Sequence, residues 1–405
     1  MLDSIRARLR EHPWHTLELG LTALLWQASA GVFLLSLVQQ YLPHHLEANP
    51  AFPGYALAAY ASSRFLLQAP AGWLADRWGR RRTLTLGIAL SFPSILLMLQ
   101  VQDPMSFIAF SGLFGAGSAA IWPAMMAYVG DTHEASTRGR ALNMLNIAQL
   151  VGLGIGTMAG VALTDYISYR AAFAACLLFS GLALFFAYRG ASVSAPPVRE
   201  EKVRGSYRGL VRELLSARML LLAGIALLLS IATSVQAPAI GAYADEVLKT
   251  KLTVLGLMLI GPGLVGGFLA VRYGHVADRF GRQVPLIGGL AVAALSYFAL
   301  SQTTHPLLAA NLVVVAALAY AVSIPAWGAS ALDATEFGGR GVMLGVLATV
   351  QSLGASAGQA IGGVSNAAWG PLAPFKMGAV LLVLALLLAI MHMRHQQRAE
   401  QALAS

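Results

Sequence analysis

The sequence is dominated by apolar runs that are each long enough to cross a lipid bilayer. An α-helix needs about 20 residues to span a hydrocarbon core of about 30 Å. Runs of this size fall at about 15–41, 53–75, 83–101, 105–129, 140–163, 169–188, 219–244, 253–274, 284–302, 306–328, 341–364 and 374–393. This pattern predicts an all-α membrane protein with twelve transmembrane helices.

The composition agrees with a lipid environment. Of the 405 residues, 57% are hydrophobic and 11% are charged, whereas a soluble domain carries about 25% charged residues. The net charge is +9, but the basic residues lie in short loops between apolar runs, so they indicate membrane topology and not a nucleic-acid-binding surface. Cys176 is the single cysteine, which excludes an internal disulfide and a cysteine-cluster metal site. No metal and no cofactor are expected.

One short basic cassette occurs twice. The stretch Gly72–Arg81, with the sequence GWLADRWGRR, recurs 202 residues later as Gly274–Gln283, with the sequence GHVADRFGRQ. A shift of half the chain indicates an internal duplication. The sequence therefore predicts two pseudo-symmetric six-helix bundles, residues 1–188 and 219–405, which are joined by a polar linker at 189–218.

The loop charges predict the orientation of the spans. With both termini in the cytoplasm, the Lys and Arg residues fall on the cytoplasmic side, as the positive-inside rule requires. The exceptions are the external Arg170, Lys249, Lys251 and Lys376 and the intramembrane Arg64. Both cassettes then face the cytoplasm, after spans 2 and 8, in a multi-pass protein of the plasma (inner) membrane.

The residues of the cassette have separate mechanical roles. Gly72 and Gly274 are expected to let a neighbouring helix approach closely, as small residues do in membranes. The carboxylates that end each span can pair with arginine. Gly79 and Gly281 permit a tight turn.

The cassette resembles the hallmark of the major facilitator superfamily, G-x-x-x-D-R-x-G-R-R between the second and third helices. The resemblance covers essentially the whole chain, because twelve spans, a central cytoplasmic linker and cytoplasmic termini are also typical of that family. Asp131 and Arg138-Gly139-Arg140 look like its second cytoplasmic charge cluster. The resemblance implies a cytoplasmic gate that an ion-pair network closes. Its expected residues are Gly72, Asp76, Arg77, Gly79, Arg80, Asp131, Arg140, Gly274, Asp278, Arg279, Gly281 and Arg282.

Two motifs of the proton-driven drug antiporters in this superfamily are incomplete. The R-x-x-Q-G-x-G motif of the fourth helix reads SGLFGAG at 111–117, without the arginine and the glutamine. The glycine array of the fifth helix keeps Gly152, Gly154, Gly156 and Gly160 but has no proline. No Asp, Glu or His lies in the middle of a predicted span, where a proton relay is expected. The sequence gives no support for proton coupling.

Arg64 is the one charged residue in the middle of a predicted span. It precedes Asp76 by twelve residues, about 18 Å along a helix. An arginine at the bilayer centre costs about 2.5–3.5 kcal/mol on insertion scales. Tyr60, Arg64 and Gln68 form one polar stripe, since residues four apart share a helix face. Two roles stay open for Arg64: binding an anionic group of a solute, or holding carbonyls of neighbouring helices as a structural pin.

The resemblance implies a central cavity that is lined mainly by helices 1, 4, 7 and 10. Those spans carry polar and aromatic residues, and Pro123, Pro238 and Pro325 are expected to kink three of them. Together with Arg64, the expected substrate-binding residues are Trp26, Gln27, Trp122, Met125, Gln236, Tyr320 and Trp327. A chamber that is mostly apolar and aromatic suits an amphipathic or weakly anionic solute.

The function expected from these features is transport by alternating access between the two bundles. The transporter, secondary active or facilitative, would move a small organic, drug-like or weakly anionic solute, with export as the leading direction. Uptake of an organic anion or metabolite is the alternative, and a non-transporting membrane sensor is a remote one. An enzyme is not expected, because the mid-span residues contain no cluster of nucleophile, acid and base or metal ligands. The expected partners are the small-molecule substrate and the lipid bilayer, with the protein as a monomer.

Overall fold

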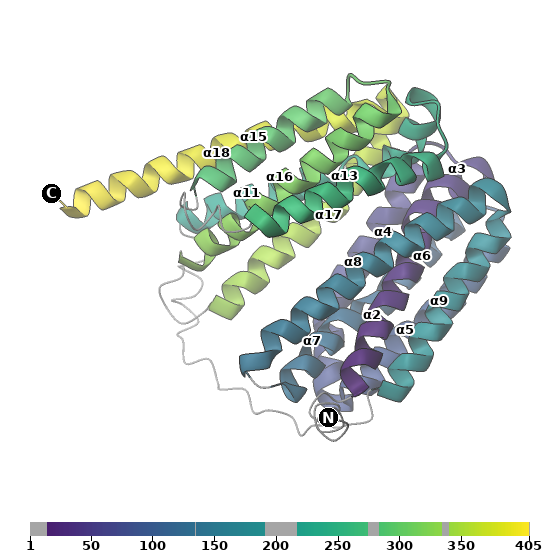
Figure 1. Ribbon diagram of the computed structural model, residues 1–405. Helices are drawn as coiled ribbons and strands as arrows, with labels where there is room; N and C mark the ends of the chain where they lie inside the picture. Colours follow the sequence, from purple (N-terminus) through teal and green to yellow (C-terminus); the bar gives the residue numbers. More distant parts are fainter. Residues whose placement is uncertain (1–13, 134, 191–216, 274–282, 334–339, 405) are drawn as a thin grey trace, which may run out of the picture. The chain divides into compact units, whose positions relative to one another are not determined.

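The computed structural model describes residues 14–133, 135–190, 217–273, 283–333 and 340–404, which form helices joined by short connections (Figure 1). The chain divides into two compact units, Met1–Glu200 and Glu201–Ser405. The division falls within the linker that the sequence predicts at 189–218, and most of that linker lies outside the described residues. Residues 274–282 of the second cassette also lie outside them.

The described residues of the first unit form six helical rods. They are α2 (Trp14–Gly31) with the π-helix η1 (Val32–Tyr41) and α3 (Leu42–His44), α4 (Phe52–Trp78), α5 (Arg80–Gln100), α6 (Pro104–Ala119) with α7 (Ile121–Thr132), α8 (Ala135–Tyr166) and α9 (Tyr169–Gly190). Each rod coincides with one predicted span. The π-helical end of the first rod has no counterpart in the prediction.

The described residues of the second unit also form six rods. They are α11 (Ala217–Ser234) with η2 (Ala237–Ala239), α12 (Ile240–Ala242) and η3 (Tyr243–Val247), α13 (Leu252–Tyr273), α15 (Gln283–Leu300), α16 (Pro306–Asp333), α17 (Arg340–Trp369) and α18 (Ala373–Ala404). The two units repeat the same helix pairs. The contacts α2–α8, α4–α6, α2–α9, α5–α6 and α5–α9 correspond to α11–α17, α13–α16, α11–α18, α15–α16 and α15–α18. The pseudo-symmetry that the repeated cassette predicts is therefore present in the packing.

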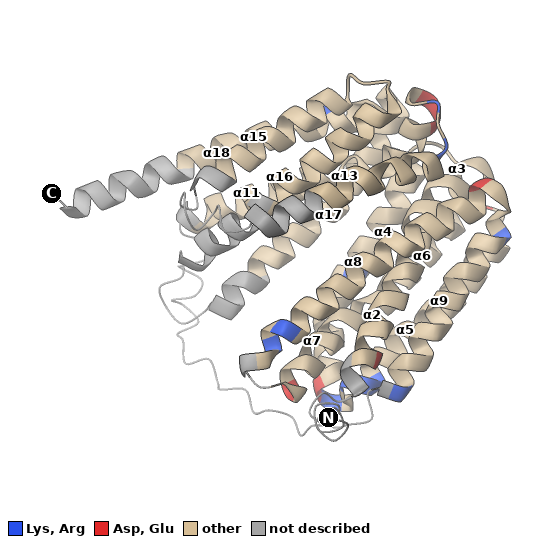
Figure 2. Ribbon diagram, in the orientation of Figure 1, with Lys and Arg blue, Asp and Glu red and all other residues tan. Residues whose placement is uncertain are grey.

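The helices have the length and hydropathy of membrane spans. In the part of the chain that the structure describes, seven helical stretches meet both criteria, and three further apolar stretches are shorter, at Leu252–Val265, Leu286–Leu300 and Pro306–Ala321. The helix α4 is not among them because Arg64 and Gln68 lower its hydropathy. Charged residues gather mostly at the helix ends (Figure 2), as expected when the middle of each rod lies in hydrocarbon.

Of the three prolines that are expected to kink a helix, two coincide with a break in the helix. Proline lacks the amide that would bond the carbonyl four residues earlier, and its ring clashes with that carbonyl. Counting back from Pro123 gives Ala119, the last residue of α6, and counting back from Pro238 gives Ser234, the last residue of α11. The helix α16 runs continuously through Pro325, so no break occurs there.

Glycine lets the first and fifth rods of each unit touch through their backbones. A Cβ added at Gly152 or Gly156 of α8 would clash with the carbonyl oxygens of Leu24 and Ala28 on α2. In the second unit, a Cβ at Gly358 of α17 would lie 2.7 Å from the carbonyl oxygen of Ile231 on α11. Close backbone approach at small residues is the usual way in which helices associate in lipid.

These glycines repeat with the same shift as the cassette. Gly152, Gly156 and Gly160 correspond, 202 residues on, to Gly354, Gly358 and Gly362, and all six face a neighbouring backbone closely. The close approach expected at Gly72 is not found, because a Cβ there would meet no described atom within 4 Å. Among the described residues of each unit, close backbone approach thus occurs at the glycine array.

We expect Gly156→Leu to destabilise the protein by about 1–3 kcal/mol, the usual cost of overpacking. The matched control is Gly154→Leu on the same helix, because Gly154 is exposed and a Cβ there meets no described atom within 4 Å. Thermal unfolding of the purified variants in detergent measures the difference. Equal melting temperatures for the two variants would contradict backbone contact at Gly156.

Candidate functional site

Gly79 separates α4 from α5 through a backbone conformation that other residues adopt at a cost. Its φ is +94°, in the left-handed half of conformational space that glycine enters freely. The Gly79 amide donates to the carbonyl of Ala75 at 3.1 Å, and the Thr83 hydroxyl donates to the carbonyl of Gly79 at 3.2 Å. The glycine therefore makes the tight turn that the cassette predicts and places Arg80 at the first position of α5.

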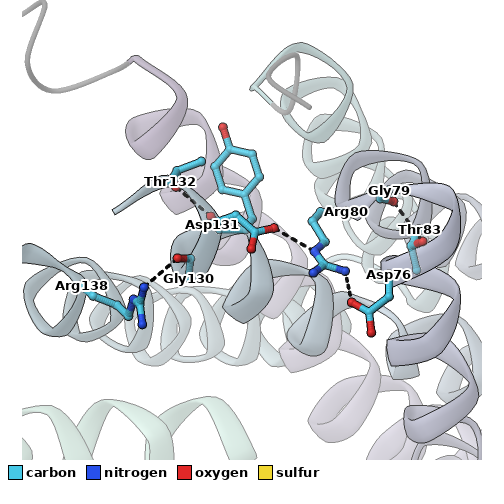
Figure 3. Close-up of polar contacts among 9 residues, drawn as sticks. Asp76, Gly79, Arg80, Thr83, Gly130, Asp131, Thr132 and Arg138 are labelled. Atoms are coloured by element: carbon cyan, nitrogen blue, oxygen red, sulfur yellow. Dashed lines mark hydrogen bonds and ion pairs between the residues drawn. The ribbon is translucent and has the colours of Figure 1, made fainter. Parts of the chain in front are cut away.

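Arg80 pairs with two carboxylates from two helices (Figure 3). Its Nη1 contacts Asp76 on α4, and its Nε lies 3.0 Å from Oδ2 of Asp131 on α7. The side chain of Asp131 is 12% exposed, whereas that of Asp76 is 60% exposed. Because exposed ion pairs contribute little, the pair with Asp131 is the stronger tie between the α4–α5 turn and α7.

The other arginines expected in the gate of the first unit, and Arg138 beside them, do not join this ion-pair cluster. The Arg77 guanidinium lies over the ring of Trp73, 4.6 Å from its centre, and Arg138 donates to the carbonyl of Gly130 at 2.9 Å. Arg140 is exposed and makes no ion pair with the described residues. Of the charged gate residues expected in the first unit, Asp76, Arg77, Arg80, Asp131 and Arg140, the structure thus joins Asp76, Arg80 and Asp131 by ion pairs. Gly274, Asp278, Arg279, Gly281 and Arg282 lie outside the described residues.

A small pocket opens within the first unit, formed by residues of α2, α4, α6, α7 and α8. Its volume is about 20 Å³. It is lined by Ala23, Trp26, Gln27, Tyr60, Arg64, Ser118, Ile121, Trp122, Met125 and Gln149. All five substrate-binding residues that the sequence places in this unit, Trp26, Gln27, Arg64, Trp122 and Met125, lie in this lining. Residues from three separate spans thus share one pocket.

Aromatic packing holds the wall of this pocket. The ring of Phe114 lies 5.3 Å from that of Trp26 and 5.9 Å from that of Tyr60. A Cβ at Gly115 would clash with the backbone of Tyr60, so α6 approaches α4 closely here. The positions of Trp26 and Tyr60 are fixed by packing that does not need a ligand.

Gln149 on α8 is a polar lining residue that is not among the expected substrate-binding residues. Its Nε2 is buried without a hydrogen-bond partner. A buried, unpaired amide is costly, and a glutamine in the middle of an apolar run is the sequence signal that could have identified it. Gln68, which shares the predicted stripe with Tyr60 and Arg64, does not line the pocket.

Of the substrate-binding residues expected in the second unit, the structure describes the side chains of Gln236 and Tyr320. Gln236 donates from Nε2 to the hydroxyl of Tyr297 at 2.7 Å, and its Oε1 is buried without a partner. Tyr320 is half-buried on α16, and the side chain of Trp327 lies outside the described residues. Across the described chain, no group of three or more His, Cys, Asp or Glu side chains has the arrangement to hold a metal ion.

Comparison with known proteins places this arrangement in a family. The family model of the major facilitator superfamily matches residues 19–233 and 222–404. The chain belongs to the major facilitator superfamily. The resemblance that the cassette indicates is thereby confirmed, and with it the all-α membrane fold. The chain is a multi-pass membrane transporter and not an enzyme.

Among its relatives in the superfamily are two bacterial proteins of similar length. The chain is 23% identical to the proton-coupled antiporter flippase LtaA of Staphylococcus saprophyticus over 351 residues, which are 84% of each chain. It is 26% identical to the class C tetracycline resistance protein of Escherichia coli, over 84% of this chain and 87% of that one. The crystal structure of a bacterial homologue of the human lysosomal transporter Spinster has the same fold, with a TM-score of 0.74 and 15% identity over 94% of this chain and 96% of that one.

The difference in burial between the two carboxylates predicts a difference in stability. We expect Asp131→Asn to destabilise the protein by about 1–3 kcal/mol, because it weakens a shielded, charge-assisted hydrogen bond. Asp76→Asn, the matched variant, is expected to cost less than about 1 kcal/mol. Melting temperatures in detergent at constant salt compare the two. A larger loss with Asp76→Asn would contradict the assignment of Asp131 as the main partner of Arg80.

Proposed function

We propose that this transporter exports a small organic solute by alternating access of its two units. The observation that carries the proposal is the pocket of the first unit, where Trp26, Gln27, Arg64, Trp122 and Met125 meet. Gln236 and Tyr320 would contribute from the second unit, and Trp327 is proposed there from the sequence. The descriptions of the relatives, an antiporter flippase and a tetracycline resistance protein, favour export.

The ion-paired end of the first unit is proposed as half of a cytoplasmic gate. Arg80 and Asp131 lie where a shift of α7 against the α4–α5 turn would break their 3.0 Å contact. An ion pair that exists in one state and not in the other biases the balance between the states. Gly72, Gly79 and the cassette of the second unit would complete the gate, with Arg77 and Arg140 at its margin.

The proposed setting is the plasma (inner) membrane, with a monomeric protein and both termini in the cytoplasm. The distribution of Lys and Arg over the loops supports this orientation. Uptake of an organic anion or metabolite is the alternative direction, and flux measured separately in right-side-out and inside-out vesicles distinguishes it from export.

Reconstitution tests the transport function. Liposomes with the purified protein are screened with radiolabelled aromatic acids, amides and amines under imposed pH, sodium and voltage gradients. We expect flux of at least one solute above that of protein-free liposomes. In Arg80→Gln we expect this flux to fall about tenfold, because losing the ion pair shifts the balance between the two conformational states by about 1.4 kcal/mol, which corresponds to that factor. The control is Arg82→Gln, an exposed neighbour. Absence of protein-dependent flux for the whole panel would contradict the proposal.

Cysteine labelling tests the orientation. We expect Arg81→Cys and Arg282→Cys to react with a membrane-impermeant maleimide in inside-out vesicles and to be protected in right-side-out vesicles. The unmodified protein is the blank, because Cys176 is fully buried. Labelling of the two positions from opposite faces would overturn both the topology and the proposed two-bundle mechanism.

A further inference from the structure

The surroundings of Arg64 within the first unit bear on the two roles that the sequence leaves open for it. A structural pin would donate to carbonyls or carboxylates of the neighbouring helices. The Arg64 side chain is exposed, and its guanidinium has no hydrogen bond, ion pair or ring contact with any described residue. By contrast, Arg80, Arg81 and Arg138 each contact a defined partner. Arg64 therefore lines the pocket with donors that no described residue satisfies.

The pocket around Arg64 is rich in hydrogen-bond donors. Arginine and tryptophan can only donate, and glutamine can donate through its amide nitrogen. The buried Nε2 of Gln149 has no acceptor. None of the described residues that line the pocket is acidic, so no internal counter-ion neutralises the guanidinium. A ligand that supplies several acceptor atoms and a negative charge would satisfy these groups together.

The size of the pocket limits the part of the ligand that can enter. A volume of about 20 Å³ is close to that needed for one or two water molecules. A headgroup of a few atoms fits this space, and a complete drug-like molecule does not. The rest of the ligand would lie beyond the mouth of the pocket, where the half-buried ring of Trp122 offers an apolar surface.

We infer that this pocket is an anchoring subsite for the anionic headgroup of an amphipathic solute, held by Arg64 and Gln149. A carboxylate or a sulfonate has the charge, the acceptor atoms and the size that the pocket requires, and Arg binds such groups through paired N–H donors. The inference rests on the proposed transport function and narrows its substrate class to organic anions. An unpaired positive charge also repels cationic solutes, so the same arginine would favour anions and exclude cations.

Three ligands with one ring system and different charge test the inference. They are 2-naphthoate, the neutral 2-naphthamide and the cationic 2-naphthylmethylammonium, measured by calorimetry on the protein in lipid nanodiscs. We expect naphthoate to bind about tenfold to a hundredfold tighter than the amide, the range for hydrogen bonds to a charged group. Arg64→Gln should reduce this preference to less than about twofold, and Gln149→Leu should weaken naphthoate binding more than amide binding.

The controls separate a binding role from a structural one. Arg170→Gln removes an exposed arginine outside the pocket and should leave the preference for naphthoate unchanged. The melting temperature of Arg64→Gln without ligand should equal that of the unmodified protein, whereas loss of a pin would lower it. Arg64→Lys should keep part of the preference.

Several results would overturn the inference. They are equal binding of the three ligands, tighter binding of the amide or the amine, no naphthoate binding at millimolar concentration, or an anion preference that survives Arg64→Gln. The flux assay reports on the proposed function independently. Protein-dependent flux of neutral or cationic solutes without anion preference would overturn the subsite and keep the transporter, whereas absence of all flux would count against the transport proposal itself.

Discussion

Backbone contact between the first and fifth rods is the interaction on which each unit depends. In lipid there is no hydrophobic force that drives one helix against another, because hydrocarbon surrounds both, so close van der Waals packing must supply the attraction. Gly152 and Gly156 allow this by placing α8 directly against the carbonyls of Leu24 and Ala28. This contact holds the rod that carries Trp26 and Gln27, and these two residues line the pocket.

Much of the fold could be predicted from the sequence, because the solvent imposes a simple rule. Every rod had to be apolar over about 20 residues, and the repeated cassette at Gly72 and Gly274 indicated the duplication. The π-helical turn at Val32–Tyr41 could not be predicted, since its hydrogen-bond register depends on the neighbours of α2 and leaves no mark in hydropathy. The repeat of the glycine array at Gly354 is present in the sequence, but spacing alone does not show that these glycines meet a neighbouring backbone.

The pocket residues were predictable to a smaller extent. Polar and aromatic residues in the middle of apolar runs are few, so Arg64 and Trp122 stood out, and the structure brings them together. Gln149 could not be predicted in this way, because it lies on the fifth span and the resemblance implies a cavity that is lined mainly by helices 1, 4, 7 and 10. The partners of arginine were not predictable, because Arg77 and Arg80 are alike in sequence and differ only in which groups lie within reach.

The glycine contacts also restrict how this transporter can evolve. Gln149 lies one helical turn before Gly152 on α8, and the two positions tolerate change very differently. A side chain at Gly152 would push the backbones of α2 and α8 apart, so substitutions at that position are not tolerated. Gln149 can be exchanged for many residues without disturbing the contact between α2 and α8. Descendants of this chain would therefore acquire new ligand preferences through substitutions at positions such as Gln149, while the neighbouring glycines are retained by purifying selection.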